Sequence, residues 1–359
     1  MWPYWLLFLL PAIIAILRPK PRSGLAKLGL HTWSLEWLFM FVFIALMIGY
    51  RHEVGGDWGN YFRYLDDAAG AALLDIVKSS DPGYMLINWI SVQMGWSIYG
   101  VNMISGTVLS LGVTYFCRDL PRPWLALVVA VPYLIVVVGM GYSRQGVALG
   151  FAMLGLVALR RKSVVWFVIW ILLGATFHKT AVLLLPIAAL ANTKNRYWTA
   201  AWVAIVMYGS YLFLLEDAVG YLYENYIEAE YQSEGAFVRV LMNALPSTVL
   251  LWKWKRFRIS DDGGNLWRWM SIISLALFGV LFVSPSSTAV DRVALYMLPL
   301  QLAVFSYVPD AIGSRRRFNQ DWVTVIVLYY AAVHFVWLNF AVHSRGWIPY
   351  RFYPLEGAL

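Results

Sequence analysis

Four short polar clusters interrupt an otherwise apolar sequence. They lie at residues 51–58 (RHEVGGDW), at residues 142–145 (YSRQ), at His178-Lys179 and at Asp291-Arg292. Cations beside acids and a histidine suit an anionic group, because the planar guanidinium of arginine binds two phosphate oxygens at once. A pyrophosphate leaving group needs charge stabilisation of this kind. The clusters therefore predict a site for an anionic substrate.

Nine cations are predicted at the outer side of a membrane, where a charge near a helix end is costly unless it is paired or functional. We predict that four of them bind the pyrophosphate: Arg51, Arg144, Arg292 and Arg239. The predicted substrate-positioning residues are Tyr61, Tyr142, Gln145, Lys179 and Asp291. Structural explanations remain open for two clusters, with Asp291-Arg292 as an ion pair and His178 as a core histidine.

The candidate catalytic residues are Asp57, Glu53 and His178. Attack by a hydroxyl needs a proton acceptor within hydrogen-bond reach. Asp57 follows two glycines, whose small size lets backbone approach a ligand, so we favour it as the base and His178 as a supporting polar ligand. The alternative is that Asp57 only orients Arg51 or Arg144 through an ion pair.

The sequence has none of the common nucleotide or metal motifs. It lacks a P-loop, a GxGxxG fingerprint, an HExxH pair and a DxD-type pair placed for a nucleotide-sugar transferase. Its single cysteine, Cys117, excludes an intrachain disulfide and a thiolate zinc site. We predict no cofactor and no metal.

The elements that position these clusters must be membrane helices. The 359 residues are 60% hydrophobic and only 13% charged, against about 25% charged in soluble domains. This composition excludes an ordinary soluble enzyme, a disordered chain and a disulfide-rich module. Nearly continuous apolar runs such as 125–140 favour helices over a barrel. The prediction is an all-α, polytopic membrane protein, with residues 1–359 forming one integral membrane domain.

Windows of about 20 apolar residues locate the spans. Twelve are expected: 4–17, 33–50, 100–116, 124–140, 145–159, 163–177, 180–191, 197–215, 237–252, 266–283, 292–308 and 322–341. Residues 163–191 equally fit one hairpin broken at His178-Lys179. Segment 83–98 is polar for a lipid-facing span, so we expect an interfacial or re-entrant helix within an outer loop at 51–99. A second, acidic outer loop is expected at 216–236.

The charges set the expected orientation. With these spans, 19 of the 28 Lys and Arg residues lie on one side, which the positive-inside rule assigns to the cytoplasm. Residues 253–262 then lie inside, whereas both termini and all four polar clusters lie outside. The first apolar segment does not read as a cleavable signal peptide, because its cations follow the apolar run.

In these residues the sequence resembles the EpsG family of Wzy-type polysaccharide polymerases. The matching residues include Arg51, Gly55, Asp57 and Tyr61, the run 81–84 (DPGY), the helix start 143–145, the break 177–179, Asp291-Arg292 with Tyr296, and the run 347–350 (WIPY). Lys179 departs from the pattern, since a small hydroxyl residue is expected after the histidine.

The resemblance implies glycosyl transfer without a metal, on a fold related to the C-type glycosyltransferases. The donor and acceptor would be undecaprenyl-pyrophosphate-linked oligosaccharides, joined into exopolysaccharide, capsule or O-antigen at the outer face of a bacterial cytoplasmic membrane. Membrane lipids and a chain-length regulator of the export machinery would be partners, and nucleic acid would not. An O-antigen-type ligase, another polyprenyl-phosphate-sugar transferase and a non-catalytic flippase remain alternatives.

Overall fold

The computed structural model describes residues 1–18, 33–190, 196–210, 232–257, 259, 261–314 and 319–356. Throughout these ranges the chain is helical apart from connections and one isolated antiparallel bridge between Arg51 and Phe352. The predicted all-α fold is therefore confirmed. The acidic loop predicted at 216–236 lies mostly outside the described residues.

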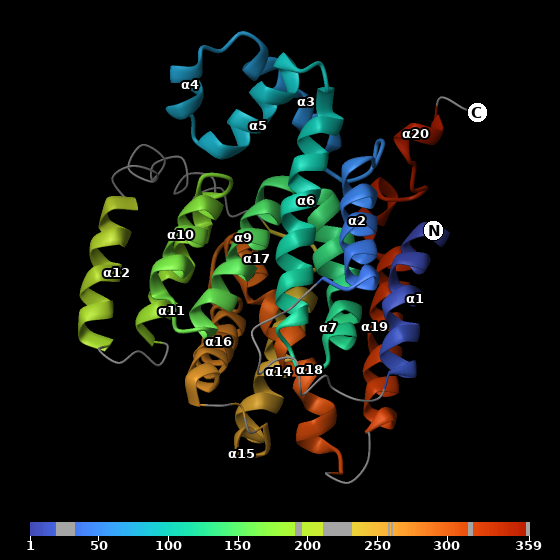
Figure 1. The fold of residues 1–359 in the computed structure, drawn as a ribbon, viewed down its shortest axis with the longest axis vertical. Coiled ribbons are helices and arrows are strands. Elements are labelled where there is room, and N and C mark those ends of the chain that lie inside the picture. Colours follow the sequence, from blue (N-terminus) through green and yellow to red (C-terminus); the bar gives the residue numbers. More distant parts are fainter. Residues whose placement is uncertain are drawn as a thin grey trace.

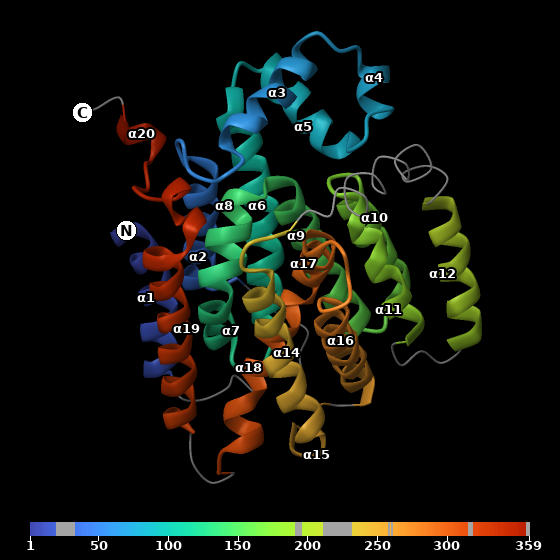
Figure 2. The same ribbon diagram turned by 180° about the vertical axis from the view of Figure 1, so that it is seen from behind.

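The long helices lie side by side in a bundle, with their axes roughly aligned (Figure 1, Figure 2). Their bounds are α1 (Trp2–Leu17), α2 (Leu35–Gly49), α3 (Trp58–Ala69), α4 (Leu73–Val77), α5 (Pro82–Gln93), α6 (Ser97–Arg118), α7 (Pro123–Ala130), η1 (Val131–Val138), α8 (Gly139–Gly141), α9 (Ser143–Arg160), α10 (Val164–Ala175), η2 (Lys179–Leu184), α11 (Leu185–Leu190), α12 (Arg196–Ser210), α14 (Ala236–Trp252), α15 (Trp254–Phe257), α16 (Asp261–Val280), α17 (Ser287–Ala294), η6 (Leu295–Met297), α18 (Leu298–Ile312), α19 (Gln320–Phe340), η7 (Val342–Gly346) and α20 (Tyr353–Glu356).

Four of the described helical stretches are long and apolar enough to cross a membrane by length and composition: Ser97–Arg118, Pro123–Gly141, Ser287–Ile312 and Gln320–Phe340. Other apolar helices, such as α1, α2 and α14, are shorter than 18 residues. The number of crossings stays a prediction.

The stretch Pro123–Gly141 forms the centre of the bundle, and its apolar window is entirely buried. A helix that is hydrophobic on all sides must be surrounded by other helices, and α7 contacts α1, α6, α18 and α19. Its second half is the π-helix η1, which contains Pro132 near its start. Proline has no N–H to donate to the helical ladder, which is consistent with a widened turn at this point.

Small residues allow the helices next to this centre to pack closely. A Cβ on Gly112 of α6 would lie 2.6 Å from the Gly150 Cα of α9, so the two backbones touch only because both residues are glycines. Small residues serve this purpose at membrane helix interfaces. The contact holds α9, which begins at the second polar cluster, against α6.

The helices α3, α4 and α5 lie together at one end of the bundle, and we call them the cap (Figure 1). Tyr61 and Leu65 of α3 form a small core with Tyr84 and Ile87 of α5 and with the start of α6. We call this end of the molecule the cap end, and the other end, where α15 lies, the α15 end. Segment 83–98 thus contains α5, which belongs to the cap; its relation to a lipid bilayer stays a prediction.

One sequence-based boundary needs correction. The eleventh helix was expected to open at Asp291-Arg292, but α17 begins at Ser287, where the Ser286 side chain accepts a hydrogen bond from the Ala289 N–H at 3.4 Å. Hydroxyl residues are preferred at this N-cap position because they satisfy a free helical N–H. Asp291 and Arg292 therefore lie inside the helix, one turn after its start.

Candidate functional site

All four polar clusters lie at the cap end and interact, through hydrogen bonds or through their charges. Arg51 of the first cluster donates to the Ser143 hydroxyl of the second at 2.7 Å. Gln145 of the second donates to the Arg292 carbonyl of the fourth at 2.8 Å. Arg144 and Arg292 also act electrostatically on His178 of the third cluster. Segments separated by up to about 240 residues along the sequence thus form one site.

Arg51 is fully buried and holds the first connection in place. Its guanidinium donates to the carbonyls of Ile48, at 2.6 Å, and Val54, at 3.2 Å, as well as to Ser143. Buried cations are retained when such bonds satisfy them. The side chain has no exposed surface, so the prediction that it contacts pyrophosphate directly does not fit this arrangement. Arg51 instead links the end of α2 to the start of α9 through these hydrogen bonds.

The connection after α2 is also fixed by the C-terminal segment. His52 N–H donates to the Arg351 carbonyl at 3.0 Å, and Gly55 N–H donates to the Gly346 carbonyl at 2.8 Å. Gly55 has a φ of 109°, and a Cβ there would collide with the Met140 carbonyl, so only glycine fits. Glu53 is exposed and forms an ion pair with Arg351. Glu53 is therefore a weaker candidate for the base than Asp57.

Tyr61 connects the cap to the second cluster. Its hydroxyl accepts a hydrogen bond from the Ser143 N–H at 2.9 Å and donates to the Gly141 carbonyl at 3.4 Å. Burial raises the pKa of Tyr61 to about 12, and the nearby Asp57 charge acts in the same direction. The hydroxyl thus stays protonated and positions the start of α9 rather than a substrate.

Arg144 forms the principal ion pair between cap and bundle. Its Nη1 lies 2.7 Å from Oδ2 of Asp81, the residue that precedes α5. The guanidinium also lies 5.0 Å from the centroid of the Tyr64 ring on α3. Burial raises the pKa of Asp81, and the charges of Arg144 and Lys179 oppose this effect. The Arg144 side chain keeps 31% of its surface exposed whereas Asp81 keeps 11%, so the cation remains accessible to a further anion.

His178 lies at the break between α10 and η2, next to a pair of hydroxyls. Its Nδ1 is 2.6 Å from the Thr180 hydroxyl and 3.5 Å from the Tyr296 hydroxyl, which accepts from Thr180 at 3.3 Å. Burial, helped by Arg144 and Arg292, lowers the pKa of His178 to about 3. The imidazole is neutral at pH 7 and is a weaker base than a solvated one. The hydroxyl expected at position 179 comes instead from Thr180.

Arg239 and Asp291 form the second ion pair of the site. Nε and Nη2 of Arg239 lie 2.8 and 2.6 Å from the two carboxylate oxygens of Asp291, a bidentate arrangement. The Ser233 hydroxyl also donates to Asp291 at 3.2 Å. Sequence analysis left open an ion pair between the neighbours Asp291 and Arg292, but in the structure Asp291 pairs with Arg239. Both side chains are largely buried, so Arg239 is a less accessible anion ligand than Arg144.

The remaining predicted residues connect the two ion pairs. Tyr142 lies between the second and fourth clusters, where the charges of Arg239, Asp291, Asp57 and Arg292 all act on its phenol. Gln145 is buried and is held by the Arg292 carbonyl. Both residues therefore position the start of α9 against α17.

Asp57 immediately precedes α3 and is partly exposed. The ion pair considered from the sequence, with Arg51 or Arg144, does not form: Arg51 binds Ser143 and two carbonyls, and Arg144 binds Asp81. The hydrogen bond found for the Asp57 carboxylate among the described residues comes from Asn60 at 3.5 Å. Asp57 therefore retains the carboxylate surface that a base needs.

Two residues that contact the site, Asp81 and Thr180, were not predicted as site residues from the sequence. Asp81 was noted within the run 81–84 but not as the partner of Arg144, and Thr180 was not singled out. The signal for Asp81 was its place before a proline and glycine at a helix start, where a carboxylate is common. Within the described residues, no group of three or more His, Cys, Asp or Glu side chains is placed to hold a metal ion.

The comparisons with known proteins agree with the resemblance seen in these motifs. Searches of curated proteins and of solved structures gave no match. The model of the EpsG family matches residues 35–352, a range that includes α2, the cap and every residue of the site described above. The chain belongs to the EpsG family.

Proposed function

We propose that this protein is a polymerase that joins undecaprenyl-pyrophosphate-linked oligosaccharide repeat units into exopolysaccharide, capsule or O-antigen. The growing glycan on its lipid pyrophosphate is the donor, and a hydroxyl of the next lipid-linked unit is the acceptor. Membership of the EpsG family supports this reaction class. The proposal includes a fold related to the C-type glycosyltransferases and a reaction that needs no metal.

The observation that carries the proposal is the environment of Arg144. Its guanidinium is oriented by Asp81, keeps 31% of its surface exposed and, like that of Arg292, acts electrostatically on the His178 imidazole. An oriented cation that retains donors can bind a pyrophosphate, and a preorganised charge stabilises a leaving group most effectively where water is limited. Lys179, whose charge acts on Asp81, adds a further cation.

The proposed step is a displacement at the anomeric carbon of the donor. The Asp57 carboxylate takes the proton of the acceptor hydroxyl, and the hydroxyl oxygen forms the new glycosidic bond. The bond between the anomeric carbon and the pyrophosphate oxygen breaks, and the lipid pyrophosphate leaves with both electrons. Arg144 and Arg292 stabilise its charge, while the neutral His178 hydrogen-bonds a phosphate or sugar oxygen.

The test is reconstitution of the purified chain with lipid-linked repeat units. The expected product is a ladder of glycans that differ by one repeat. A single transfer to a different lipid acceptor, without a ladder, would indicate a ligase instead. Movement of labelled substrate across the vesicle bilayer without any new glycosidic bond would indicate a flippase and would contradict the proposal.

We further propose that the protein is a twelve-span protein of the bacterial cytoplasmic membrane, with its cap end facing the periplasm. This orientation is supported by Lys253, Lys255 and Arg256 at the α15 end, because such cations mark the cytoplasmic side. It matches the chemistry, since a lipid-linked donor needs no cytoplasmic nucleotide. Cysteines introduced at residues 51–99 should react with an impermeant reagent from outside, and those at 253–262 only after permeabilisation. The opposite pattern would contradict this orientation.

A further inference from the structure

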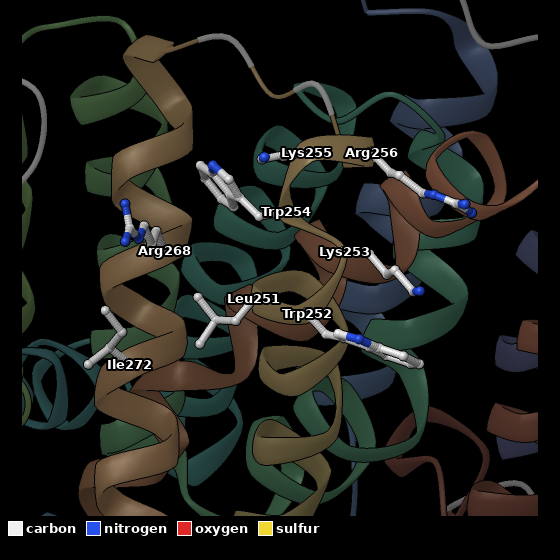
Figure 3. Close-up of a pocket in the computed structure, with 8 residues that line it drawn as sticks. All are labelled: Leu251, Trp252, Lys253, Trp254, Lys255, Arg256, Arg268 and Ile272. Carbon is white, nitrogen blue, oxygen red and sulfur yellow. The ribbon is translucent and has the colours of Figure 1, made fainter.

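A hollow at the α15 end has no part in the chemistry proposed above. Its volume is about 670 Å³, and it lies where α14 ends, along α15 and against the first half of α16 (Figure 3). Four of the residues that line it are cations: Lys253, Lys255, Arg256 and Arg268. The hollow therefore offers a concentrated positive charge at the end of the molecule opposite to the cap.

These four cations differ from their neighbours at the same end. Arg122 is paired with Asp310 at 2.7 Å, and Arg160 is paired with Asp119 at 2.6 Å. Across the side chains that the structure describes, no carboxylate lies within 4 Å of the cations in the hollow. The contact of Lys253 is with an aromatic ring, since its Nζ lies 3.8 Å from the Trp252 ring centroid. Among the described side chains, their charges are thus not neutralised by an ion pair.

Apolar side chains line the hollow beside the cations. Trp252 is 75% exposed and Ile272 is 38% exposed, and Leu251 lies between α14 and α16 (Figure 3). Arg268 and Ile272 are one turn apart on α16, whereas Lys253 and Arg256 lie on the other side of α15. Exposed tryptophan at a helix end is typical of the zone between lipid tails and water. The hollow therefore combines cations with apolar groups at a helix end.

We propose that this hollow is a binding site for the headgroup of an anionic phospholipid. The headgroup phosphates lie over α15, with Lys255 and Arg268 on one side of this helix and Lys253 and Arg256 on the other, and the acyl chains run along Leu251, Trp252 and Ile272. Basic pockets between membrane helices on the cytoplasmic side suit such headgroups. A soluble phosphate compound would use the cations but leave the apolar side chains uncovered. This site is independent of the proposed polymerase reaction.

The competing explanation is that the four cations only set membrane orientation. In that case they attract anionic lipids no more than any other basic segment of equal charge. The run Arg315–Arg317, which lies outside the described residues, provides such a segment with three cations.

The experiment measures lipid binding by native mass spectrometry of the full chain released from detergent micelles. The probes are diphosphatidylglycerol and phosphatidylcholine, with inorganic pyrophosphate as a soluble competitor. The variant K253Q/R256Q/R268Q should bind diphosphatidylglycerol about tenfold more weakly or worse, because basic residues near the surface contribute additively. The control R315Q/R316Q/R317Q, which loses the same charge, should bind like the wild type. Phosphatidylcholine should bind equally weakly to all three.

Two further arms keep the proposal testable. Trp252→Ala changes an exposed side chain, so it should fold normally and weaken diphosphatidylglycerol binding several-fold, even if the triple variant is unstable. Inorganic pyrophosphate should displace the lipid only at far higher concentration. The proposal is overturned if both triple variants lose binding equally, if Trp252→Ala binds like the wild type, or if pyrophosphate displaces the lipid as effectively as diphosphatidylglycerol itself.

Discussion

Two of the Arg–Asp pairs, Arg144–Asp81 at the cap end and Arg122–Asp310 at the α15 end, differ in which partner faces outward. At the cap end, Arg144 keeps 31% of its side chain exposed and Asp81 keeps 11%. At the α15 end, Arg122 keeps 6% and Asp310 keeps 40%. Both pairs have an N–O distance of 2.7 Å. The same interaction therefore presents a cation at one end and a carboxylate at the other.

This difference indicates what each pair can do. Arg122 directs both Nε and Nη2 at Asp310, at 2.9 and 2.7 Å, so its bidentate fork is occupied. Arg144 directs Nη1 at Asp81, and a guanidinium has five N–H donors. The Arg144 pair can accept an anionic substrate without breaking, whereas the Arg122 pair joins α7 to α18. The buried Asp81 carboxylate therefore orients Arg144 through one N–H donor and leaves the exposed part of the guanidinium free of this pairing.

The largest expected effect concerns the carboxylates at the two ends. Asp57→Asn should reduce turnover by about 10²–10⁴-fold, the usual contribution of a general base, while donor binding is retained. The matched change at the α15 end is Asp310→Asn, which removes one carboxylate charge far from the site and should leave turnover within about twofold. Both are measured with lipid-linked repeats in purified, folded protein. Equal losses in the two variants would remove Asp57 from the mechanism.

The next effect concerns the two arginines. Arg144→Lys keeps the charge but loses the bidentate fork, so turnover should fall about 10–100-fold, the value of one charge-assisted hydrogen bond or two. Arg122→Lys should leave turnover nearly unchanged and lower the free energy of unfolding by about 1–3 kcal/mol. The measurements are glycan-ladder formation and thermal unfolding in detergent. If Arg122→Lys impaired turnover as strongly as Arg144→Lys, the two pairs would not differ in function.

The difference between the ends was only partly predictable from the sequence. Apolar runs located the long apolar helices to within about five residues, because hydrophobic length is a local property. They did not predict α3 and α4, which lie in the segment 51–99 that was expected to be a loop with one helix. Arg144 could be predicted as a site residue because a cation between two apolar helices is costly unless it is paired or functional. Its partner Asp81 is 63 residues away, and the partner of Asp291 is Arg239, 52 residues away. Such long-range pairs depend on how helices pack, which one sequence does not reveal.

The burial of Arg51 illustrates the same limit. Its position beside a glycine pair and Asp57 suggested a ligand-binding loop, yet the C-terminal segment 346–352 covers this connection. A cation that follows a helix end binds either substrate or backbone carbonyls, and the choice depends on a segment about 300 residues away. The same holds for His178, whose hydroxyl partner Tyr296 comes from η6, more than 100 residues further along the chain.

The smallest expected effect concerns the pH dependence of the cap end. The pKa of His178 lies at about 3, below its ordinary value of 6.5, because the imidazole is buried near Arg144 and Arg292. Because of this depressed pKa, the folded protein keeps His178 neutral across pH 5–8. Below pH 6.5 the histidine of the unfolded chain takes up a proton that the folded protein does not, so the free energy of unfolding falls as the pH is lowered. His178→Gln keeps a neutral hydrogen-bonding side chain, so turnover should fall only several-fold and the shape of its pH profile should not change. The measurement is turnover from pH 5.5 to 8 in both proteins, with Thr180→Val testing the partner of Nδ1. A wild-type step near pH 6.5 that disappears in His178→Gln would show that the histidine is protonated during the reaction, and would make it a candidate base in place of Asp57.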